Sequence, residues 1–176
     1  MISRHMGARA FIPAALAAAI LFSLAPTTPA AATTPTTTTV TEAQQIIRIA
    51  RAHIGAPWRY GASGPYAFDC SGLVRYAYQR AGDAARIHTT FLRSARSLYL
   101  YFKARGLASR TNPRIGDLVI WGYGTHVGIY IGSGRAISTL RSGVRSHSIF
   151  AVTARFTTFL HTGMSTQIAT TAAPTN

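Results

Sequence analysis

The only cysteine of the chain, Cys70, stands where a loop gives way to a helical pattern, in the run Asp69-Cys70-Ser71-Gly72-Leu73-Val74. At the start of a helix, free backbone N–H groups and the positive end of the helix dipole favour thiolate over thiol. We therefore expect Cys70 to be a nucleophile whose pKa lies below the value of about 8.5 of a free cysteine. Asp69 suits the N-cap of this helix, and Gly72 is expected to let a substrate backbone approach. The alternative is an inert thiol, because free cysteine is among the most buried residue types.

His126 is the candidate base for this thiol. It begins the run His126-Val127-Gly128-Ile129-Tyr130-Ile131, in which aliphatic residues alternate with other types as in a strand. Successive side chains of a strand point to opposite faces, so His126 shares its face with Gly128 and Tyr130 rather than with the aliphatic side chains. A thiol nucleophile needs a base within about 3 Å. The pattern therefore predicts that Cys70 and His126 meet as a Cys–His pair.

Helices are expected to come first in the chain. Thr41-Glu42-Ala43-Gln44 is a capping-box pattern that opens a helix, and Gly55 ends it. A second helix starts at Asp69 or Cys70, and a third runs over about 90–105. The side chains predicted to be buried on these helices are Ile46, Ile49, Ala50 and Ile54 on the first, Leu73, Ala77 and Ala81 on the second, and Leu92, Ala95, Leu98, Tyr99 and Phe102 on the third.

Strands are expected to follow. Beyond Pro113 the pattern changes to short β-branched or aromatic runs separated by Gly and Ser turns. The predicted strands are Leu118–Trp121, His126–Ile131, Ala136–Leu140, Val144–Ser148 and Phe156–Leu160. Helices first and antiparallel strands afterwards indicate an α+β fold, in which N-terminal helices pack on a C-terminal antiparallel sheet.

The N-terminus has the pattern of a secretory signal. Residues 1–9 are basic and contain no acid, and an apolar run follows over 10–24. This run is shorter than the roughly 20 residues that a membrane span needs. Ala30-Ala31-Ala32 offers a small-residue cleavage site, so we expect 1–32 to be a signal peptide and the mature protein to have no stable membrane insertion. An uncleaved anchor is the alternative.

The rest of the chain is expected to form one domain between two tails. A chain of 176 residues that is 48% hydrophobic is long enough for one globular domain. Residues 33–40 are a Thr/Pro-rich linker and 165–176 are a low-complexity tail, and neither can bury much apolar surface. The domain is therefore predicted over 41–164. A single cysteine excludes an intramolecular disulfide and a cysteine-based zinc site, and we expect no metal and no cofactor.

Three blocks in order resemble the NlpC family of cell-wall cysteine endopeptidases, which has a compact papain-like fold. The blocks are Asp69-Cys70-Ser71-Gly72, Gly116-Asp117-Leu118 and His126-Val127-Gly128, and the match covers roughly 43–160. The resemblance implies Cys70 as nucleophile and His126 as base. It also implies a secreted or cell-wall protein that cleaves peptide bonds of the peptidoglycan stem, typically between D-γ-glutamyl and diaminopimelate.

The family usually has a third histidine, or another polar residue, on the strand after the base, and here Ser138 holds that position. Its separation of twelve residues from His126 is even. A turn at 132–134 would pair Gly128 opposite Ser138 and keep Ser138 on the same face as His126. A serine hydroxyl can accept the imidazole N–H, but it supplies no charge to stabilise imidazolium. His147 on the following strand is the alternative orienting residue.

Trp58 stands where the family commonly has a tyrosine close to the nucleophile. Its indole N–H is a donor that can serve the oxyanion site beside the backbone N–H of Cys70. A packing aromatic is the alternative. Asp69 and Ser71 complete the predicted substrate and oxyanion residues.

The charge of the chain bears on its partners. Lys and Arg total 18 against 4 Asp and Glu, which gives a net charge of +14. The arginines form no basic run and belong to no nucleic-acid module, so nucleic acid is not an expected partner. Anionic cell-wall polymers and the carboxylates of stem peptides are the natural counter-charge of an exported protein, and a solvated surface is the alternative. We expect a monomer.

Two other functions fit the same residues. A non-catalytic wall-binding or scaffold protein that keeps the fold is one, because Ser138 and Trp58 depart from the family pattern. An amidase or acyltransferase with the same dyad is the other, since water and amine acceptors look alike in sequence. Cys70 and His126 are both present, which favours the hydrolase.

Overall fold

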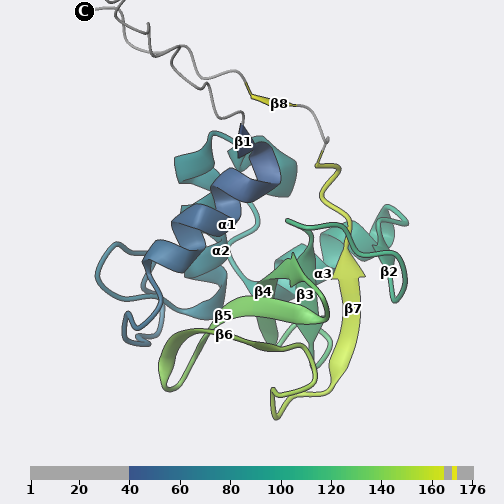
Figure 1. The fold of residues 1–176 in the computed structure, drawn as a ribbon. Helices are drawn as coiled ribbons and strands as arrows, with labels where there is room; N and C mark the ends of the chain where they lie inside the picture. The colour runs from purple at the N-terminus through teal and green to yellow at the C-terminus, as the bar shows by residue number, and fades with distance from the viewer. Residues whose placement is uncertain (1–39, 165–167, 170–176) are drawn as a thin grey trace, which may run out of the picture. The chain divides into compact units, whose positions relative to one another are not determined.

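The computed structural model describes residues 40–164 and 168–169. In chain order its elements are β1 (Val40–Thr41), α1 (Glu42–Ala52), α2 (Cys70–Ala81), the 3-10 helix η1 (Ala84–Ile87), α3 (Ala95–Ala104), β2 (Ala108–Ser109), β3 (Leu118–Trp121), β4 (His126–Gly132), β5 (Arg135–Leu140), β6 (Gly143–Ser148), β7 (Phe156–Leu160) and β8 (Ile168–Ala169). The helices precede the main sheet, as Figure 1 shows, so the predicted α+β layout is confirmed.

Side-chain caps determine where the first two helices begin. Thr41 Oγ1 accepts from the N–H of Gln44, whose side chain accepts from the N–H of Thr41, and this is the predicted capping box of α1. Asp69 caps α2. The prediction that Ile54 extends the buried side of α1 is wrong, because α1 ends at Ala52 and Ile54 lies 50% exposed in the turn that follows.

The third helix is shorter than predicted. It begins at Ala95 rather than near Thr90, because Ser94 caps it and forms a reciprocal capping box with Ser97. Serine at this third helical position differs from the usual Glu or Gln, so the sequence pattern did not reveal this helix start. The residues before it form η1 and a turn. Of the predicted apolar side of α3, Ala95, Leu98, Tyr99 and Phe102 are buried.

Six strands form an antiparallel sheet in the order β2-β7-β3-β4-β5-β6. The five predicted strands are present, each within one residue of its predicted bounds, and the short β2 is added at one edge. The pairing of Ile129 with Ile137 puts Gly128 opposite Ser138 and confirms the predicted register of β4 and β5. His126 and Ser138 therefore share one face of the sheet.

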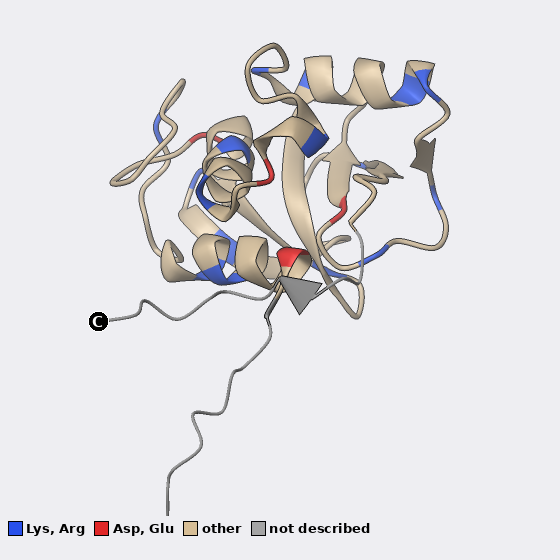
Figure 2. Ribbon diagram, turned by 90° about the horizontal axis from the view of Figure 1, so that it is seen from above, with Lys and Arg blue, Asp and Glu red and all other residues tan. Residues whose placement is uncertain are grey.

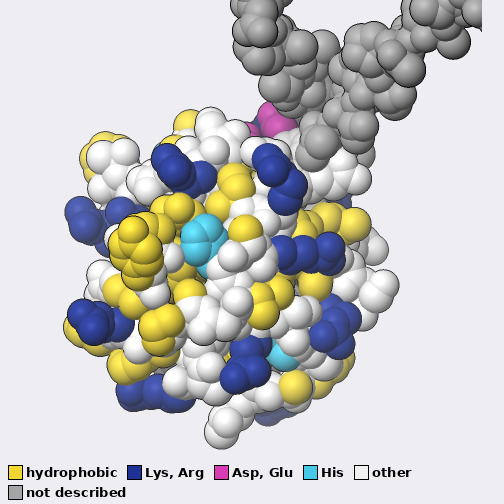
Figure 3. Space-filling view, turned by 60° about the vertical axis from the view of Figure 1, so that its left-hand side comes forward, with side chains coloured by type: hydrophobic (Ala, Val, Ile, Leu, Met, Phe, Trp, Pro, Cys, Tyr) yellow, Lys and Arg dark blue, Asp and Glu magenta, His cyan; other side chains and the backbone are white. Residues whose placement is uncertain are grey.

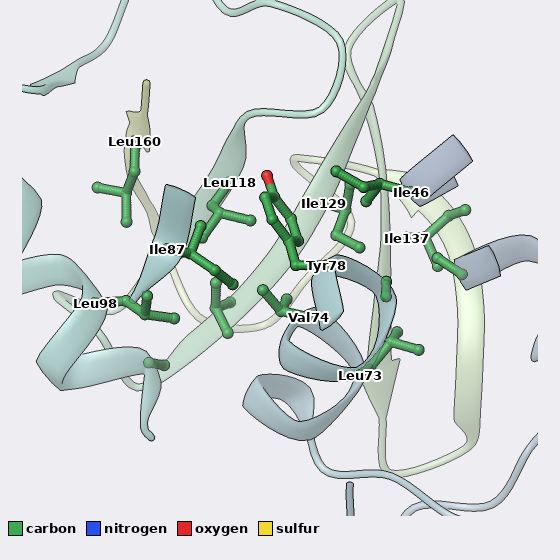
Figure 4. Close-up of a cluster of buried hydrophobic side chains, with 14 of the residues drawn as sticks. Ile46, Leu73, Val74, Tyr78, Ile87, Leu98, Leu118, Ile129, Ile137 and Leu160 are labelled. Carbon is green, nitrogen blue, oxygen red and sulfur yellow. The ribbon is translucent and has the colours of Figure 1, made fainter. Parts of the chain in front are cut away.

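The two faces of this sheet carry different cores. Helices α2 and α3 contact one face, and α1 packs on α2. Figure 4 shows the aliphatic side chains that meet there, among them Ile46, Leu73, Val74, Ile87, Leu98, Leu118, Ile129, Ile137 and Leu160. The other face carries a smaller and more aromatic cluster of Val119, Trp121, Tyr130, Ala136, Ile149 and Phe159. His126 pairs across the strands with Trp121 and so lies on this second face.

The two ends of the described chain meet. β1 pairs antiparallel with β8, with Val40 opposite Ala169. Arg86 binds the Glu42 carboxylate at 2.5 Å and the carbonyl of Gly163 at 2.6 Å. These contacts join the start of α1, η1 and the segment after β7.

The predicted flanking segments fall largely outside the described residues. These are the signal peptide over 1–32, most of the linker over 33–40 and most of the tail over 165–176. Within 40–164 and 168–169, no helix combines the length and the apolar character needed to cross a membrane. The positions of Lys and Arg are scattered over helices and loops in the ribbon of Figure 2. On the face in Figure 3, their side chains lie apart among apolar and neutral groups.

Candidate active site

A cleft of about 850 Å³ contains most of the predicted site residues. It is lined by parts of the loop before α2, the start of α2, the start of α3, the β3–β4 turn, the end of β5 and residues 151–154. The predicted residues that line it are Trp58, Asp69, Cys70, Ser71 and His126. Ser138 is fully buried behind His126.

Asp69 holds the helix start that carries Cys70. Its Oδ1 accepts from the N–H of Gly72 at 2.6 Å and from the hydroxyl of Ser71 at 2.9 Å. Its Oδ2 accepts from the N–H of Gly61 at 2.9 Å, which ties the preceding loop to the helix. The Ser71 hydroxyl also lies 3.2 Å from a backbone carbonyl just before α3. These hydrogen bonds give Asp69 and Ser71 a structural role, and their contact with substrate stays a prediction.

The loop before α2, rather than a substrate, lies close against Gly72. A Cβ at this position would lie 2.0 Å from the carbonyl oxygen of Ala62, so α2 can pack against the loop only through glycine. The expectation that Gly72 leaves room for a substrate backbone is therefore wrong. Its space is taken by the loop before α2.

Burial raises the pKa of the Cys70 thiol, so the expected lowering of this pKa is wrong. Desolvation disfavours the thiolate, and the negative charge of Asp69 acts in the same direction. Backbone N–H groups of Val127, Ser71 and Cys70 itself lower the pKa, but burial outweighs them. The free thiol is therefore the resting form at neutral pH.

Three hydrogen bonds run back from His126 into the sheet. His126 Nε2 lies 2.9 Å from Ser138 Oγ, and Ser138 Oγ lies 2.8 Å from Nε2 of His147. His147 Nδ1 lies 2.9 Å from the carbonyl oxygen of Ser148. The two residues that the sequence offered as alternatives are therefore both present in one chain of bonds, with Ser138 against His126 and His147 behind it.

Trp121 and Gly128 hold this arrangement. The Trp121 ring centroid lies 5.2 Å from that of His126 and 5.9 Å from that of His147. Its indole N–H donates at 2.7 Å to a backbone carbonyl of the loop after β6, which fixes the ring. A Cβ at Gly128 would lie 2.9 Å from the Cβ of Ser138. Glycine on β4 therefore gives Ser138 the room to reach His126.

Burial lowers the pKa of His126 to about 4, and the nearby His147 acts in the same direction. A buried imidazolium loses hydration, so the neutral ring is favoured. His126 is therefore neutral at pH 7 and is able to accept a proton. Thiol and imidazole together rest as an uncharged pair.

Three arginines bring positive charge to the cleft. The Arg141 guanidinium lies 4.0 Å from the ring centroid of Trp58, a cation–π contact that holds both side chains in the cleft wall. Arg93 and Arg96 line the same cleft. Arg93 precedes the N-cap of α3, Arg96 lies in its first turn, and Arg141 comes from the β5–β6 turn, so no local sequence pattern singled them out.

Asp117, from the Gly-Asp-Leu block, is buried and has a structural role. It accepts from the N–H of Arg114 at 2.9 Å and from the N–H of Thr162 at 3.0 Å. Its Oδ2 also lies 2.8 Å from Nδ1 of His161, whose Nε2 lies 2.8 Å from the hydroxyl of Ser109. Asp117, His161 and Ser109 are not among the residues that line the cleft.

Comparison with known proteins finds relatives over most of the domain. The model of the NlpC/P60 family matches residues 55–163. The probable endopeptidase Cgl2188 of Corynebacterium glutamicum is 34% identical over 140 residues, which are 78% of this chain and 58% of that protein. The murein DD-endopeptidase MepH of Escherichia coli is 41% identical over 96 residues, 51% of this chain and 33% of MepH. The probable endopeptidase p60 of Listeria monocytogenes is 33% identical over 107 residues, 59% of this chain and 20% of that protein. The chain thus spans from about a fifth to about three fifths of the length of these relatives.

Solved structures show the same fold. The peptidoglycan hydrolase RipB of Mycobacterium tuberculosis is 26% identical with a TM-score of 0.51, over 68% of this chain and 63% of that chain. RipD of the same organism, described as a non-catalytic NlpC/p60 domain protein adapted to peptidoglycan binding, is 22% identical with a TM-score of 0.53. It is matched over 69% of this chain and 97% of RipD. These likenesses confirm the predicted papain-like α+β fold.

Proposed function

Because the chain belongs to the NlpC/P60 family, we propose that it is a secreted cysteine endopeptidase that cleaves the stem peptides of peptidoglycan, typically between D-γ-glutamyl and diaminopimelate. One observation carries the proposal above all. The thiol of Cys70 lies half-buried at the start of α2, in a cleft that His126 also lines. The predicted signal peptide over 1–32 and the linker over 33–40 would deliver the domain over 41–164 to the cell wall.

The proposed reaction starts from the uncharged pair. As the sulfur of Cys70 attacks the scissile carbonyl carbon, the thiol proton passes to His126. His126 then gives this proton to the leaving amine, and the acyl group stays on sulfur as a thioester. Water, which loses a proton to His126, attacks the thioester and releases the carboxylate and the free thiol. A raised thiol pKa and a lowered imidazole pKa both favour this order, in which charge develops only during attack.

The developing oxyanion needs hydrogen-bond donors in the cleft. The backbone N–H of Cys70 belongs to the first turn of α2, where N–H groups have no acceptor within the helix. We assign it as one donor and the indole N–H of Trp58 as the second. Asp69 and Ser71 support this site by holding the helix start.

The charge of the cleft fits an anionic peptide. Arg93, Arg96 and Arg141 line it, and Asp69 is the one acid among its lining residues. The Asp69 carboxylate is already hydrogen-bonded to backbone N–H groups. Guanidinium groups bind carboxylates through two parallel hydrogen bonds, and stem peptides carry free carboxylates. The arginines are therefore proposed to orient the substrate.

Digestion of purified muropeptides with mass readout tests the function. We expect the wild type to release fragments cut within the stem peptide, and Cys70→Ala and Cys70→Ser to release none. Detachment of the whole peptide from the sugar would instead identify an amidase. A wild type that binds sacculi but releases no product would be a non-catalytic wall-binding protein. Either result would overturn the proposal.

A further inference from the structure

The hydrogen bonds behind His126 have a direction that is set at their far end. A carbonyl oxygen only accepts, so the Nδ1 of His147 carries a proton that it donates to Ser148. The Nε2 of a neutral His147 is then an acceptor and takes the hydroxyl proton of Ser138. The Ser138 oxygen is left to accept a proton from Nε2 of His126. The backbone carbonyl of Ser148 thus determines the tautomer of His126, which lies three hydrogen bonds away.

We propose that His147 is a positioning residue that acts through Ser138 to keep the proton of His126 on Nε2, which leaves Nδ1 free to take the proton of Cys70. The inference deepens the proposed function, on which it rests for the role of Cys70. Ser138 alone cannot determine this direction, because a hydroxyl can donate to His126 as readily as it can accept from it. His147 removes the choice by accepting the hydroxyl proton.

The direction of these hydrogen bonds affects His126 because Ser138 is buried. Ser138 has no exposed surface, so bulk water cannot replace a missing partner for its hydroxyl. Without an acceptor at His147, the hydroxyl proton would turn to Nε2 of His126. The proton of His126 would then move to Nδ1, the nitrogen that has to accept the thiol proton.

The strands are built to allow this contact. His147 on β6 pairs with Ala136 on β5, and Ser138 is the next residue on the same face of β5. The small side chain of Ala136 lets the imidazole reach diagonally to Ser138, a neighbour within range of a long side chain. Trp121 packs against both imidazoles from β3.

Two substitutions separate this role from simple packing. His147→Gln keeps an acceptor near the position of Nε2 and cannot be protonated, whereas His147→Leu keeps similar bulk without an acceptor. On a soluble stem peptide we expect His147→Leu to lower kcat about tenfold or more with KM nearly unchanged. We expect His147→Gln to recover most of kcat, because its side-chain oxygen can accept the Ser138 hydroxyl proton. His53→Gln, a histidine outside the cleft that bonds to the carbonyl of Ile49, is the matched control and should match the wild type.

The outcomes are decisive in both directions. Equal kcat for His147→Leu and the wild type would overturn the proposal. So would a His147→Gln variant as impaired as His147→Leu while both melt at the wild-type temperature.

A measurement without substrate separates this inference from the proposed function. Nitrogen-15 NMR of the resting full-length protein reports which ring nitrogen of His126 carries the proton. We expect Nε2–H in the wild type and in His147→Gln, and a shift toward Nδ1–H in His147→Leu. Nδ1–H in the wild type, or no change in His147→Leu, would overturn the inference even if muropeptides are cleaved. The expected spectra would support it even if no cleavage is found.

Discussion

Two clusters in this protein hold a histidine between hydrogen-bonding partners, and they differ in what the histidine faces. In the cleft cluster, His126 lies 2.9 Å from the Ser138 hydroxyl. In the second, which we name the Asp117 cluster, His161 lies 2.8 Å from the Ser109 hydroxyl and 2.8 Å from the Asp117 carboxylate. The Asp117 cluster therefore has the partner types of a Ser-His-Asp triad, and the cleft cluster has no carboxylate on its histidine.

The residue types alone would favour the Asp117 cluster as a catalytic triad, but the hydrogen bonds around each cluster favour the cleft cluster. The Ser109 hydroxyl also bonds to the Thr111 carbonyl at 2.8 Å, and Asp117 accepts from two backbone N–H groups. The groups of the Asp117 cluster are thus used to join β2, β3 and the segment after β7. In the cleft cluster, no hydrogen bond among the described residues occupies Nδ1 of His126. The difference teaches that a free ring nitrogen in a cleft, not the number of partners, leaves a histidine able to accept a proton.

The largest expected effect compares the two candidate nucleophiles. Cys70→Ala should lower muropeptide cleavage by about 10⁴-fold or more, and Ser109→Ala should leave it within about twofold, because Ser109 does not line the cleft. Initial rates with chromatographic and mass readout measure both. Loss of cleavage in a folded Ser109→Ala protein would reverse the assignment of the two clusters.

Stability should show the opposite order. Asp117→Ala leaves the buried N–H of Thr162, the N–H of Arg114 and the His161 ring without their acceptor, and should lower the free energy of unfolding by about 3 kcal/mol or more. Ser138→Ala should lower it by about 1 kcal/mol. Urea denaturation followed by circular dichroism measures both. A larger loss for Ser138→Ala would mean that the cleft cluster carries the stability.

The lowered pKa of His126 makes stability depend on pH. Folded His126 has a pKa of about 4 against about 6.5 when unfolded, so the unfolded state binds more protons between these values. The free energy of unfolding should therefore fall as the pH drops from 6.5 to 4, by up to about 3 kcal/mol from this group. The difference between wild type and His126→Gln at each pH isolates the contribution. Parallel curves for the two proteins would show that His126 is not buried as a neutral ring.

The raised pKa of the Cys70 thiol should shift the pH dependence of its alkylation, an effect smaller than the change in stability expected from His126. Since burial raises the pKa of Cys70, alkylation by iodoacetamide should reach half its maximal rate above pH 8.5, the approximate value of a free cysteine. Rates measured from pH 6 to pH 11 test this, with a short cysteine peptide as reference. A plateau already reached near neutral pH would indicate a resting thiolate–imidazolium pair.

The smallest effect concerns a hydroxyl without a partner. Thr139 Oγ1 is buried in the cleft wall and has no hydrogen-bond partner among the described residues. Thr139→Val keeps the shape and removes the unsatisfied group, so stability should rise by about 1 kcal/mol. Thermal melting detects this change. A lower melting temperature for Thr139→Val would show that the Thr139 hydroxyl has a hydrogen-bond partner in the folded protein.

Local patterns predicted much of what positions the site. The cap at Asp69 and the start of α2 follow from neighbouring residues, and the shared face of His126 and Ser138 follows from strand parity. Such features depend on separations of a few residues or on an even spacing across a short turn. They are therefore visible in one sequence.

Features that depend on contacts between distant segments could not be predicted from the sequence. The raised pKa of Cys70 comes from burial by segments far along the chain, which outweighs the helix start. The serial order of Ser138 and His147 depends on a diagonal contact between β5 and β6. The cation–π contact of Trp58 with Arg141 joins residues more than eighty positions apart. In each case the deciding neighbour is supplied by packing, not by spacing.

Because β1 pairs with β8, the first and last described residues of the domain lie side by side. Val40 and Ala169 face each other across one strand pair, so a short peptide could join them without moving α1 or β7. New ends could then be opened in the β4–β5 turn, where Ser133 and Gly134 both have positive φ angles. Such a circular permutant would place Ser138 near its new N-terminus and His126 near its new C-terminus, and the pairing of β4 with β5 would hold the two side chains together. By the same geometry, the domain could be inserted into a surface loop of another protein with little strain on either partner.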